Sequence, residues 1–279
     1  MEYAEIAVTT VSTIAFAAAC CLYVVHLALS DVKAIGWIAA SAAWLGLAIN
    51  TVALVLHGTR EARIPLTSGY DFAMLFAWGI VAAYLVTEIV TGQRTLGGIP
   101  LFLAVALHLY ARHVFGDTPQ VNLPPALKNP FWLTVHVIVA VVAYGVLAVS
   151  FATAMMYLLR RWADKRKRAW VAQRIPEQGW LDVVTYRVVA FAFPFLTLVV
   201  ITGAIWADTA WGRPWAWDPK ETLSLVAWAF YALYLHSRLL TGWRGVGNAI
   251  CAIVGFLAVL FCYVGPNYLP GLHSYQIIE

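Results

Sequence analysis

The sequence predicts an all-α integral membrane protein with about eight transmembrane helices and with the N- and C-termini on the extracytoplasmic side. Its 279 residues are 62% hydrophobic and only 11% charged, whereas a soluble domain carries about 25% charged residues. The mean hydropathy is +0.76. The apolar residues gather in runs close to the ~20 residues that a helix needs to cross a bilayer. These observations exclude a soluble globular domain.

Eight such runs follow one another along the chain. We predict spans at about residues 5–29, 35–57, 70–91, 98–115, 131–159, 183–207, 220–240 and 247–265. The breaks between them are rich in Gly, Pro, Ser, Asn and Asp, which favour turns. The whole chain, 1–279, is predicted to be a single polytopic membrane domain. A Pro-rich loop at 116–130 would divide a four-helix part, 1–115, from a part at 131–279 that carries the distinctive motifs.

The distribution of Lys and Arg predicts which ends of the spans face the cytoplasm. The loops that follow the first, third, fifth and seventh spans, together with the span ends beside them, hold 12 Lys and Arg, and the opposite side holds 6. Cytoplasmic loops carry the excess of positive charge. We therefore expect both termini and the loop between the sixth and seventh spans to lie on the extracytoplasmic side.

One segment, RRWADKRKR at 160–168, supplies much of this positive charge. Basic residues clustered beside a span are typical of contact with anionic lipid headgroups of the bilayer, and we favour this over binding of nucleic acid. The four cysteines lie within apolar runs and form no CxxC pair. The sequence therefore contains no redox motif of its own.

Tryptophan is concentrated in one predicted external loop, residues 206–221. Its members are Trp206, Trp211, Trp215 and Trp217. Tryptophans also gather at membrane interfaces as an aromatic belt, and this interpretation stays open. A binding platform is the alternative, because a flat aromatic ligand would stack on the rings and bury apolar area. The carboxylates of such a ligand would pair with Arg213 and Lys220.

The end of this loop has a structural explanation of its own. Asp218 is a good N-cap, Pro219 suits the first helical position, and Glu221 lies three residues after the cap. We expect these residues to begin the seventh span. A capping role does not exclude that Asp218 also contributes to a binding site.

Three of the seven histidines are candidate iron ligands. His136 lies about six residues into the fifth span, ~9 Å from its outer end, and His273 lies in the C-terminal segment. Two neutral imidazoles can hold a haem iron from opposite faces, although each could instead be a hydrogen-bonded structural residue. His236 lies about 17 residues into the seventh span, ~26 Å deeper, so it would serve a second site.

These residues closely resemble the signature motifs of the CcsA (ResC) family of cytochrome c biogenesis proteins. The segment WGRPWAWDPKETLSLVAWAFYALYLHSR, residues 211–238, resembles the tryptophan-rich (WWD) motif of the family. RIPLTSGYDF, WLTVHVIVAVVAYG and GLHSY are similar to three further family segments in matching order, so the resemblance covers most of the chain. The chain departs from the pattern at Leu223, where members often carry an aromatic residue, which puts one wall of the platform in doubt.

The resemblance implies haem delivery to the extracytoplasmic face and covalent attachment of haem to CxxCH in apocytochrome c, as part of a cytochrome c synthase (haem lyase). Haem b would be a substrate held transiently, with its iron between His136 and His273 and with His236 at a second, intramembrane position. The haem-contacting residues would be Trp206, Trp211, Arg213, Trp215, Trp217, Asp218 and Lys220. No catalytic acid or base is assigned.

The resemblance also implies partners and a location. A CcsB (ResB)-like membrane protein is the expected partner, as a separate chain. Because that partner is not part of this chain, the residue opposite His236 stays open, and His26 is one candidate. A thiol-reducing protein is a further candidate partner. The membrane would be a bacterial cytoplasmic membrane or a thylakoid-type membrane, with the active face extracytoplasmic.

Two other functions remain as alternatives. One is a haem exporter or chaperone without ligation activity, similar to CcmC-type proteins that share a tryptophan-rich loop. The other is a b-type electron-transfer membrane protein with resident haem. That class tends to place its histidine pairs within helices at matching depth, whereas here two histidines are expected outside and the third at the other side.

Overall fold

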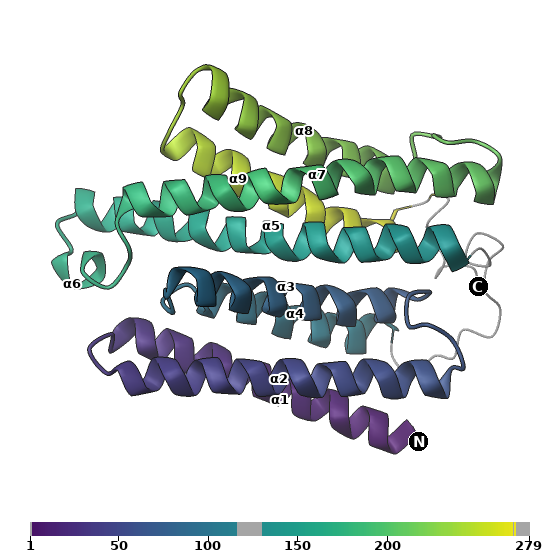
Figure 1. Cartoon of the computed structure of the whole chain (residues 1–279), viewed down its shortest axis with the longest axis horizontal. Helices are drawn as coiled ribbons and strands as arrows, with labels where there is room; N and C mark the ends of the chain where they lie inside the picture. Colours follow the sequence, from purple (N-terminus) through teal and green to yellow (C-terminus); the bar gives the residue numbers. More distant parts are fainter. Residues whose placement is uncertain (1, 116–129, 270, 272–279) are drawn as a thin grey trace. The chain divides into compact units, whose positions relative to one another are not determined.

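The computed structural model describes residues 2–115, 130–269 and 271, and this part of the chain consists of helices joined by turns and loops (Figure 1). Eight of its helices are long and apolar enough to cross a membrane. The predicted all-α membrane fold is therefore confirmed. The orientation of the termini stays a prediction.

The helices follow the predicted order. They are α1 (Glu2–Ala28), α2 (Lys33–Arg60), α3 (Gly69–Thr91), α4 (Gly98–Phe115), α5 (Pro130–Lys165), α6 (Ala169–Ala172), α7 (Gln178–Trp211), α8 (Pro219–Leu240), α9 (Val246–Val264) and the 3-10 helix η2 (Gly265–Asn267). α5 runs past the predicted end at 159, because Arg, Lys and Ala have high helix propensity. α7 continues to Trp211, so the predicted loop 206–221 is non-helical only at 212–218.

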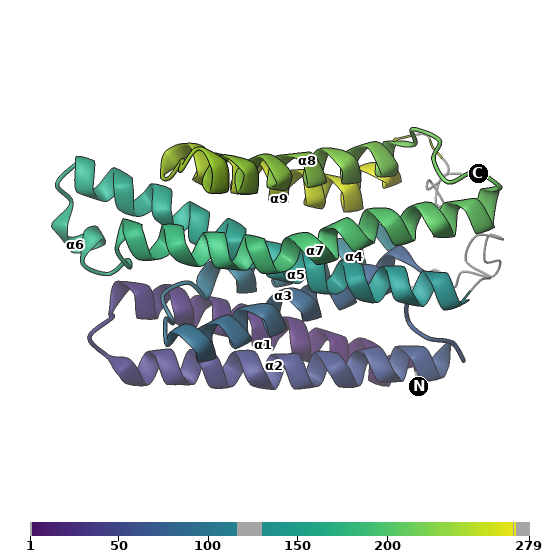
Figure 2. The same ribbon diagram turned by 45° about the horizontal axis from the view of Figure 1, so that its top comes forward.

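The described helices form two compact units. The first contains α1–α4 together with residues 159–180, and the second contains α5 up to residue 158, α7 from residue 181, α8 and α9. In the first unit, α1 packs against α2 and α4, and α3 packs against the same two helices (Figure 2). In the second unit, α8 packs along α9.

Packing in the second unit joins α5 to its neighbours through small polar and aromatic side chains. Thr185 Oγ1 of α7 lies 2.8 Å from Thr153 Oγ1 of α5. Phe151 of α5 packs on Phe256 of α9 with ring centroids 5.1 Å apart. These contacts join α5 to both α7 and α9, and the candidate site is built at the end of this bundle where α5 begins.

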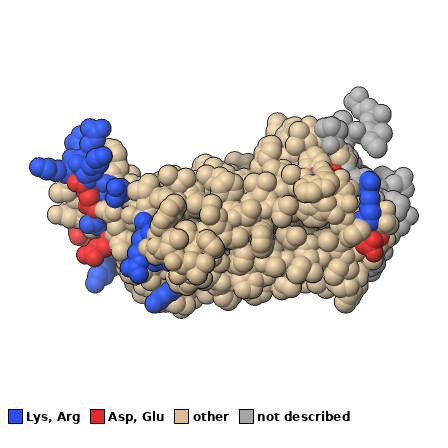
Figure 3. All heavy atoms as spheres, turned by 90° about the horizontal axis from the view of Figure 1, so that it is seen from above, with Lys and Arg blue, Asp and Glu red and all other residues tan. Residues whose placement is uncertain are grey.

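Charged side chains gather toward the ends of the helices. On the face in Figure 3, Lys, Arg, Asp and Glu lie toward two ends, and other residues fill the band between them. Large apolar side chains stand exposed on the helices, for example Ile89 (69% exposed) and Val90 (78% exposed) of α3. Exposed apolar surface of this kind suits a helix bundle surrounded by lipid chains.

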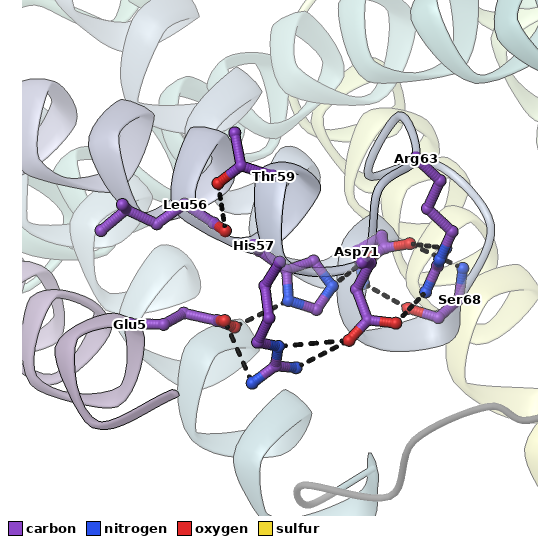
Figure 4. A network of polar contacts seen from close by, with 9 residues as sticks. Glu5, Leu56, His57, Thr59, Arg63, Ser68 and Asp71 are labelled. Atoms are coloured by element: carbon purple, nitrogen blue, oxygen red, sulfur yellow. Dashed lines mark hydrogen bonds and ion pairs between the residues drawn. The ribbon is translucent and has the colours of Figure 1, made fainter. Parts of the chain in front are cut away.

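A buried charge network ties together one end of α1, α2 and α3. Its central residue, His57, has Nδ1 at 2.7 Å from Glu5 Oε1 and Nε2 at 2.7 Å from Asp71 Oδ1 (Figure 4). Carboxylates only accept, so an imidazolium with a proton on each nitrogen suits this position. Arg60 pairs with Glu5 at 3.1 Å, and Arg63 pairs with Asp71 at 3.0 Å. The network lets charged groups remain inside an apolar bundle.

Asp71 also fixes the backbone that begins α3. Its Oδ2 accepts from the backbone N–H groups of Thr67 and Ser68, both at 2.9 Å. The Ser68 hydroxyl accepts in turn from the Asp71 backbone N–H at 3.0 Å, which completes a capping box. Asp71 is fully buried, so water cannot replace its carboxylate as the acceptor for the Thr67 and Ser68 N–H groups.

A second network lies at the other end of α3. Glu88 Oε2 accepts from the hydroxyls of Tyr23 and Tyr84 at 2.6 and 2.7 Å, and its Oε1 accepts from Arg94 Nε at 3.0 Å. The Arg94 guanidinium stacks on Trp37, 3.6 Å from the ring centroid. Two buried tyrosines and a partly exposed arginine thus surround one carboxylate, as hydrocarbon surroundings require.

We predict that Asp71→Ala destabilises the protein strongly, because it leaves His57, Arg63 and two backbone N–H groups without their buried acceptor. Removal of one member of a buried pair costs about 3–5 kcal/mol. Thermal unfolding in detergent should show a large fall in Tm. Asp31→Ala, at an exposed carboxylate between α1 and α2, is the matched control and should leave Tm nearly unchanged. Equal, small shifts in both variants would contradict the role assigned to Asp71.

Candidate functional site

The tryptophan-rich loop is held by the first turn of α8. Asp218 is the N-cap, its carboxylate accepts from the Lys220 backbone N–H at 2.9 Å, and Pro219 is the first helical residue. Glu221 Oε2 reaches back to the N–H groups of Ala216 and Asp218, at 2.7 and 3.2 Å. The predicted capping box is therefore present, and Glu221 also fixes the middle of the loop.

Two residues of the loop have left-handed backbone conformations. Gly212 ends α7 with φ +70°, where a glycine carries no steric penalty. Trp217 has φ +57°, which is unfavourable for a bulky side chain and persists only where the surrounding contacts impose it. Trp217 lies next to the Asp218 cap and is 70% exposed, so the strained backbone directs a large apolar ring toward the surroundings.

His136 of α5 is held by a single turn of α7. Its Nδ1 lies 3.2 Å from Thr202 Oγ1. Its ring lies against Gly203, where an added Cβ would be 3.1 Å from the His136 Cε1 atom. The ring of Trp206 lies 5.8 Å from the His136 ring at an interplanar angle of 30°. The imidazole is thus held by a hydrogen bond to Thr202, by packing on the helix backbone at Gly203 and by contact with the ring of Trp206.

A cavity of about 50 Å³ joins His136 to the loop. Four of the predicted site residues line it, namely His136, Trp206, Trp215 and Lys220. Further lining residues are Tyr144, Gly203, Pro214, Glu221, Ser224 and Cys262. The wall therefore combines an imidazole, two indoles, an amine and a carboxylate with a tyrosine and a thiol. Ligand pockets usually measure about 300–1,000 Å³, so a porphyrin could not lie within this cavity as it stands.

The remaining tryptophans of the motif lie beside this cavity. Trp211 packs on the buried Trp206, with ring centroids 5.8 Å apart. Trp217 packs edge-on against Trp215, with centroids 5.7 Å apart. The indoles thus form two pairs, one at the end of α7 and one in the loop. Arg213 is exposed in the loop and is not among the residues that line the cavity.

His236 lies far along α8 from this cavity. It is 17 residues beyond Pro219, or about 26 Å at 1.5 Å per residue, and its side chain is exposed. Its neighbour Arg238 pairs with Asp182 of α7. The structure therefore separates His236 from His136 within one unit, as the helix length predicts.

His273 lies outside the described residues, but Gly271 is described. A Cβ at Gly271 would collide with the Asp218 carboxylate and lie 3.0 Å from Pro219 Cδ. The chain two residues before His273 therefore packs directly against the N-cap of α8. Only glycine allows this close approach.

Sequence reasoning missed Thr202, Gly203, Tyr144 and Cys262. A helical repeat could have found two of them, because Thr202 lies one turn before Trp206 and Tyr144 lies two turns after His136. Cys262 gives no such signal, since it looks like any small apolar residue of α9. It is buried, and its Sγ donates to the Lys220 carbonyl oxygen at 3.4 Å.

Among the described residues, no group of three or more His, Cys, Asp or Glu could hold a metal ion. Two imidazoles can nevertheless hold the iron of a haem, whose porphyrin supplies the other four ligands. His136 is the imidazole that lines the cavity.

Comparison with known proteins identifies relatives of the chain. A family model described as "Cytochrome C assembly protein" matches residues 66–273. The chain is 35% identical over 228 residues to "Cytochrome c biogenesis protein CcsA" of Chlamydomonas reinhardtii, covering 80% of this chain and 64% of that protein. The chain thus spans just under two thirds of the length of that relative.

Cyanobacterial relatives are covered more fully. The chain is 33% identical over 275 residues to the protein of the same name from Thermosynechococcus vestitus, covering 82% of this chain and 85% of the relative. It is 34% identical over 279 residues to that of Synechococcus elongatus, covering 82% and 86%.

We predict that Glu221→Ala loosens the loop, because Glu221 is the acceptor for two loop amides. A hydrogen bond to a charged group contributes about 1.5–3 kcal/mol, so exchange of the Ala216 and Asp218 amides should accelerate about tenfold or more. Hydrogen exchange read by mass spectrometry measures this. Asp208→Ala, at an exposed carboxylate near the end of α7, is the control. Unchanged exchange across residues 212–218 in the Glu221 variant would contradict the assigned role.

Proposed function

Because the chain belongs to the CcsA family of cytochrome c biogenesis proteins, we propose that it presents haem at one face of the membrane and attaches it to apocytochrome c. Haem b would be a substrate rather than a resident cofactor. The observation that carries this proposal is the shared cavity, because His136, Trp215 and Lys220 line one space.

The iron would be held by His136 and His273. His136 lines the cavity and is fixed by contacts from α7. The support for His273 is the packing of Gly271 on Asp218, because this contact ties the preceding chain to the base of the same loop. Two histidine ligands would also protect the iron until one leaves for the histidine of CxxCH.

The porphyrin would contact the tryptophan-rich segment. Trp215 and the exposed Trp217 would supply aromatic faces, and Trp206 and Trp211 would add a second pair of rings at the end of α7. Lys220 lines the cavity and would pair with a propionate from within, while the exposed Arg213 would pair from outside. Asp218 would act through the cap that shapes the loop.

Haem binding would require the loop to move. The cavity is about 50 Å³ and is lined by Pro214 and Trp215 together with His136, so these residues would move apart to admit a porphyrin. The loop lies between a glycine at φ +70° and a strained tryptophan at φ +57°, and both positions can absorb a change of backbone angles. Residues 212–218 would therefore close over the haem edge after binding.

Covalent attachment would require little acid–base catalysis by the protein. Each cysteine thiol of CxxCH adds across one haem vinyl group: a C–S bond forms and the hydrogen goes to the neighbouring carbon. The addition consumes no oxidant or reductant. Holding the vinyls beside the thiols is then the main contribution, and correct placement alone gives large rate gains.

The active face would be extracytoplasmic, in a bacterial cytoplasmic membrane or a thylakoid-type membrane. The asymmetry of Lys and Arg supports this orientation. A CcsB-like membrane protein would be the partner, and a thiol-reducing protein would keep the CxxCH cysteines reduced. The exposed His236 would belong to a second, intramembrane haem position on the delivery route.

We predict that His136→Gly and His273→Gly each weaken haem binding and that added imidazole partly restores it. A glycine leaves space in which imidazole can replace the missing ligand. Absorbance spectra of the purified protein, titrated with haem, measure occupancy and ligation. Substitution of His108, whose nitrogens contact Thr13 and Asn50 within the first unit, is the control. Unaltered spectra in both His136 and His273 variants would end the ligand assignment.

We predict covalent haem on an apocytochrome c that carries CxxCH when it is incubated with the chain, its partner protein and reduced haem. Pyridine haemochrome spectra and haem-stained gels detect the thioether product. A haem chaperone would lose haem without forming product, and a b-type electron-transfer protein would keep its haem. A CxxCH peptide with both cysteines replaced by serine is the control, and either alternative outcome would overturn the proposed ligation.

A further inference from the structure

We infer that Thr202 is a positioning residue for His136: its hydroxyl fixes which imidazole nitrogen carries hydrogen and which one binds iron. This inference rests on the proposed function, because it concerns how the chain prepares one haem ligand. It adds to that function a residue of α7 that lies outside the tryptophan-rich loop.

The direction of the hydrogen bond follows from the other partner of Thr202. Its Oγ1 lies 2.6 Å from the Leu198 carbonyl oxygen, one turn earlier in α7. A carbonyl oxygen only accepts, and a threonine hydroxyl has a single hydrogen to donate. That hydrogen is directed to Leu198, so Thr202 acts as the acceptor at the 3.2 Å contact with His136 Nδ1.

The tautomer of His136 follows from this direction. Nδ1 carries the hydrogen that is donated to Thr202, and in the neutral imidazole the lone pair then lies on Nε2. Nε2 is the nitrogen that would bind the haem iron. A ligating histidine that donates its other N–H to a fixed acceptor has a defined orientation and greater basicity.

The position of the ring is fixed by the same turn of α7. Gly203 allows the imidazole to lie against the helix backbone, because a Cβ there would be 3.1 Å from Cε1. Trp206, only 4% exposed, packs beside the ring. Thr202 itself is 7% exposed, so water does not readily replace its hydroxyl as the acceptor.

The histidines of the first unit provide a comparison. His108 is 3% exposed and contacts Thr13 Oγ1 with Nδ1 at 3.0 Å and Asn50 Nδ2 with Nε2 at 3.3 Å. Both of its nitrogens thus serve the packing of the helices. His136 instead is only partly buried, and its side chain lines the cavity beneath the loop. A contact with threonine therefore helps to pack helices together at His108, whereas at His136 it orients a ring that lines a cavity.

The test uses Thr202→Val, which keeps the branched shape and removes the acceptor, and Thr202→Ser, which keeps the hydroxyl. Thr209→Val is the matched control, because Thr209 lies on the same helix and donates to the Trp206 carbonyl at 2.8 Å. Each purified full-length protein is titrated with haem, followed by absorbance and by redox titration of the bound iron.

We expect Thr202→Val to weaken haem binding about tenfold or more, as loss of an outer-shell partner does at other metal-ligating histidines, and to shift the midpoint potential. Thr202→Ser and Thr209→Val should bind haem as the unaltered chain does. Against a His136→Gly background without added imidazole, Thr202→Val should cost nothing more, because the ring on which it acts is gone.

The possible results separate the two proposals. Weaker haem binding in His136→Gly with unaltered binding and potential in Thr202→Val would overturn the positioning role and leave the proposed function standing. A Thr202→Val loss of the same size with and without His136 would also overturn it. Unaltered haem binding in His136→Gly would overturn the proposed ligand itself. If Thr202→Val does not fold, Thr202→Ala removes the same acceptor with a smaller side chain, and unaltered haem binding and potential in that variant would overturn the inference.

Discussion

The constraint on which the rest of the molecule depends is that hydrocarbon offers no hydrogen bonds, so each buried polar group must find its partner within the protein. The helices satisfy their own backbones. Among the described side chains, Glu88 has three donors around it, and Glu5, His57 and Asp71 share charges with two arginines. The charged residues of these two networks lie near helix ends, where they join one helix to the next.

The same constraint sorts the histidines by role. His57 faces two carboxylates and His108 faces two neutral side chains, so in both residues the two nitrogens hold helices together. His136 is placed differently, with Nδ1 directed to a threonine and its ring in the wall of a cavity that two indoles and an amine also line. The proposed haem ligand thus differs from the two structural histidines in what surrounds its ring.

The eight spans were predictable because lipid imposes a length and composition on each helix, and these are local properties of the sequence. The capping box at Asp218 and Glu221 was predictable for the same reason, since it needs only four consecutive residues. Helix ends outside hydrocarbon were less predictable. α5 continues to Lys165 because Arg, Lys and Ala favour helix there, and α7 continues to Trp211 although Asp208, Thr209 and Trp211 have low helix propensity. The contact between Thr202 and His136 joins residues 66 positions apart, and no local pattern specifies it.

The loop is held by hydrogen bonds, and the cavity beneath it is too small for the proposed substrate. The hydrogen bonds that fix the loop also keep the cavity small. Glu221 holds two loop amides and Asp218 caps α8, which keeps Trp217 in a costly left-handed conformation. The closed arrangement therefore stores a small amount of strain, on the order of 1–3 kcal/mol for such a residue. Stacking of a porphyrin on the exposed indole would offset the cost of opening, because it buries a ring that is 70% exposed. A site for a transient substrate benefits from this balance, since a loop that gripped haem without cost would not release it to an acceptor.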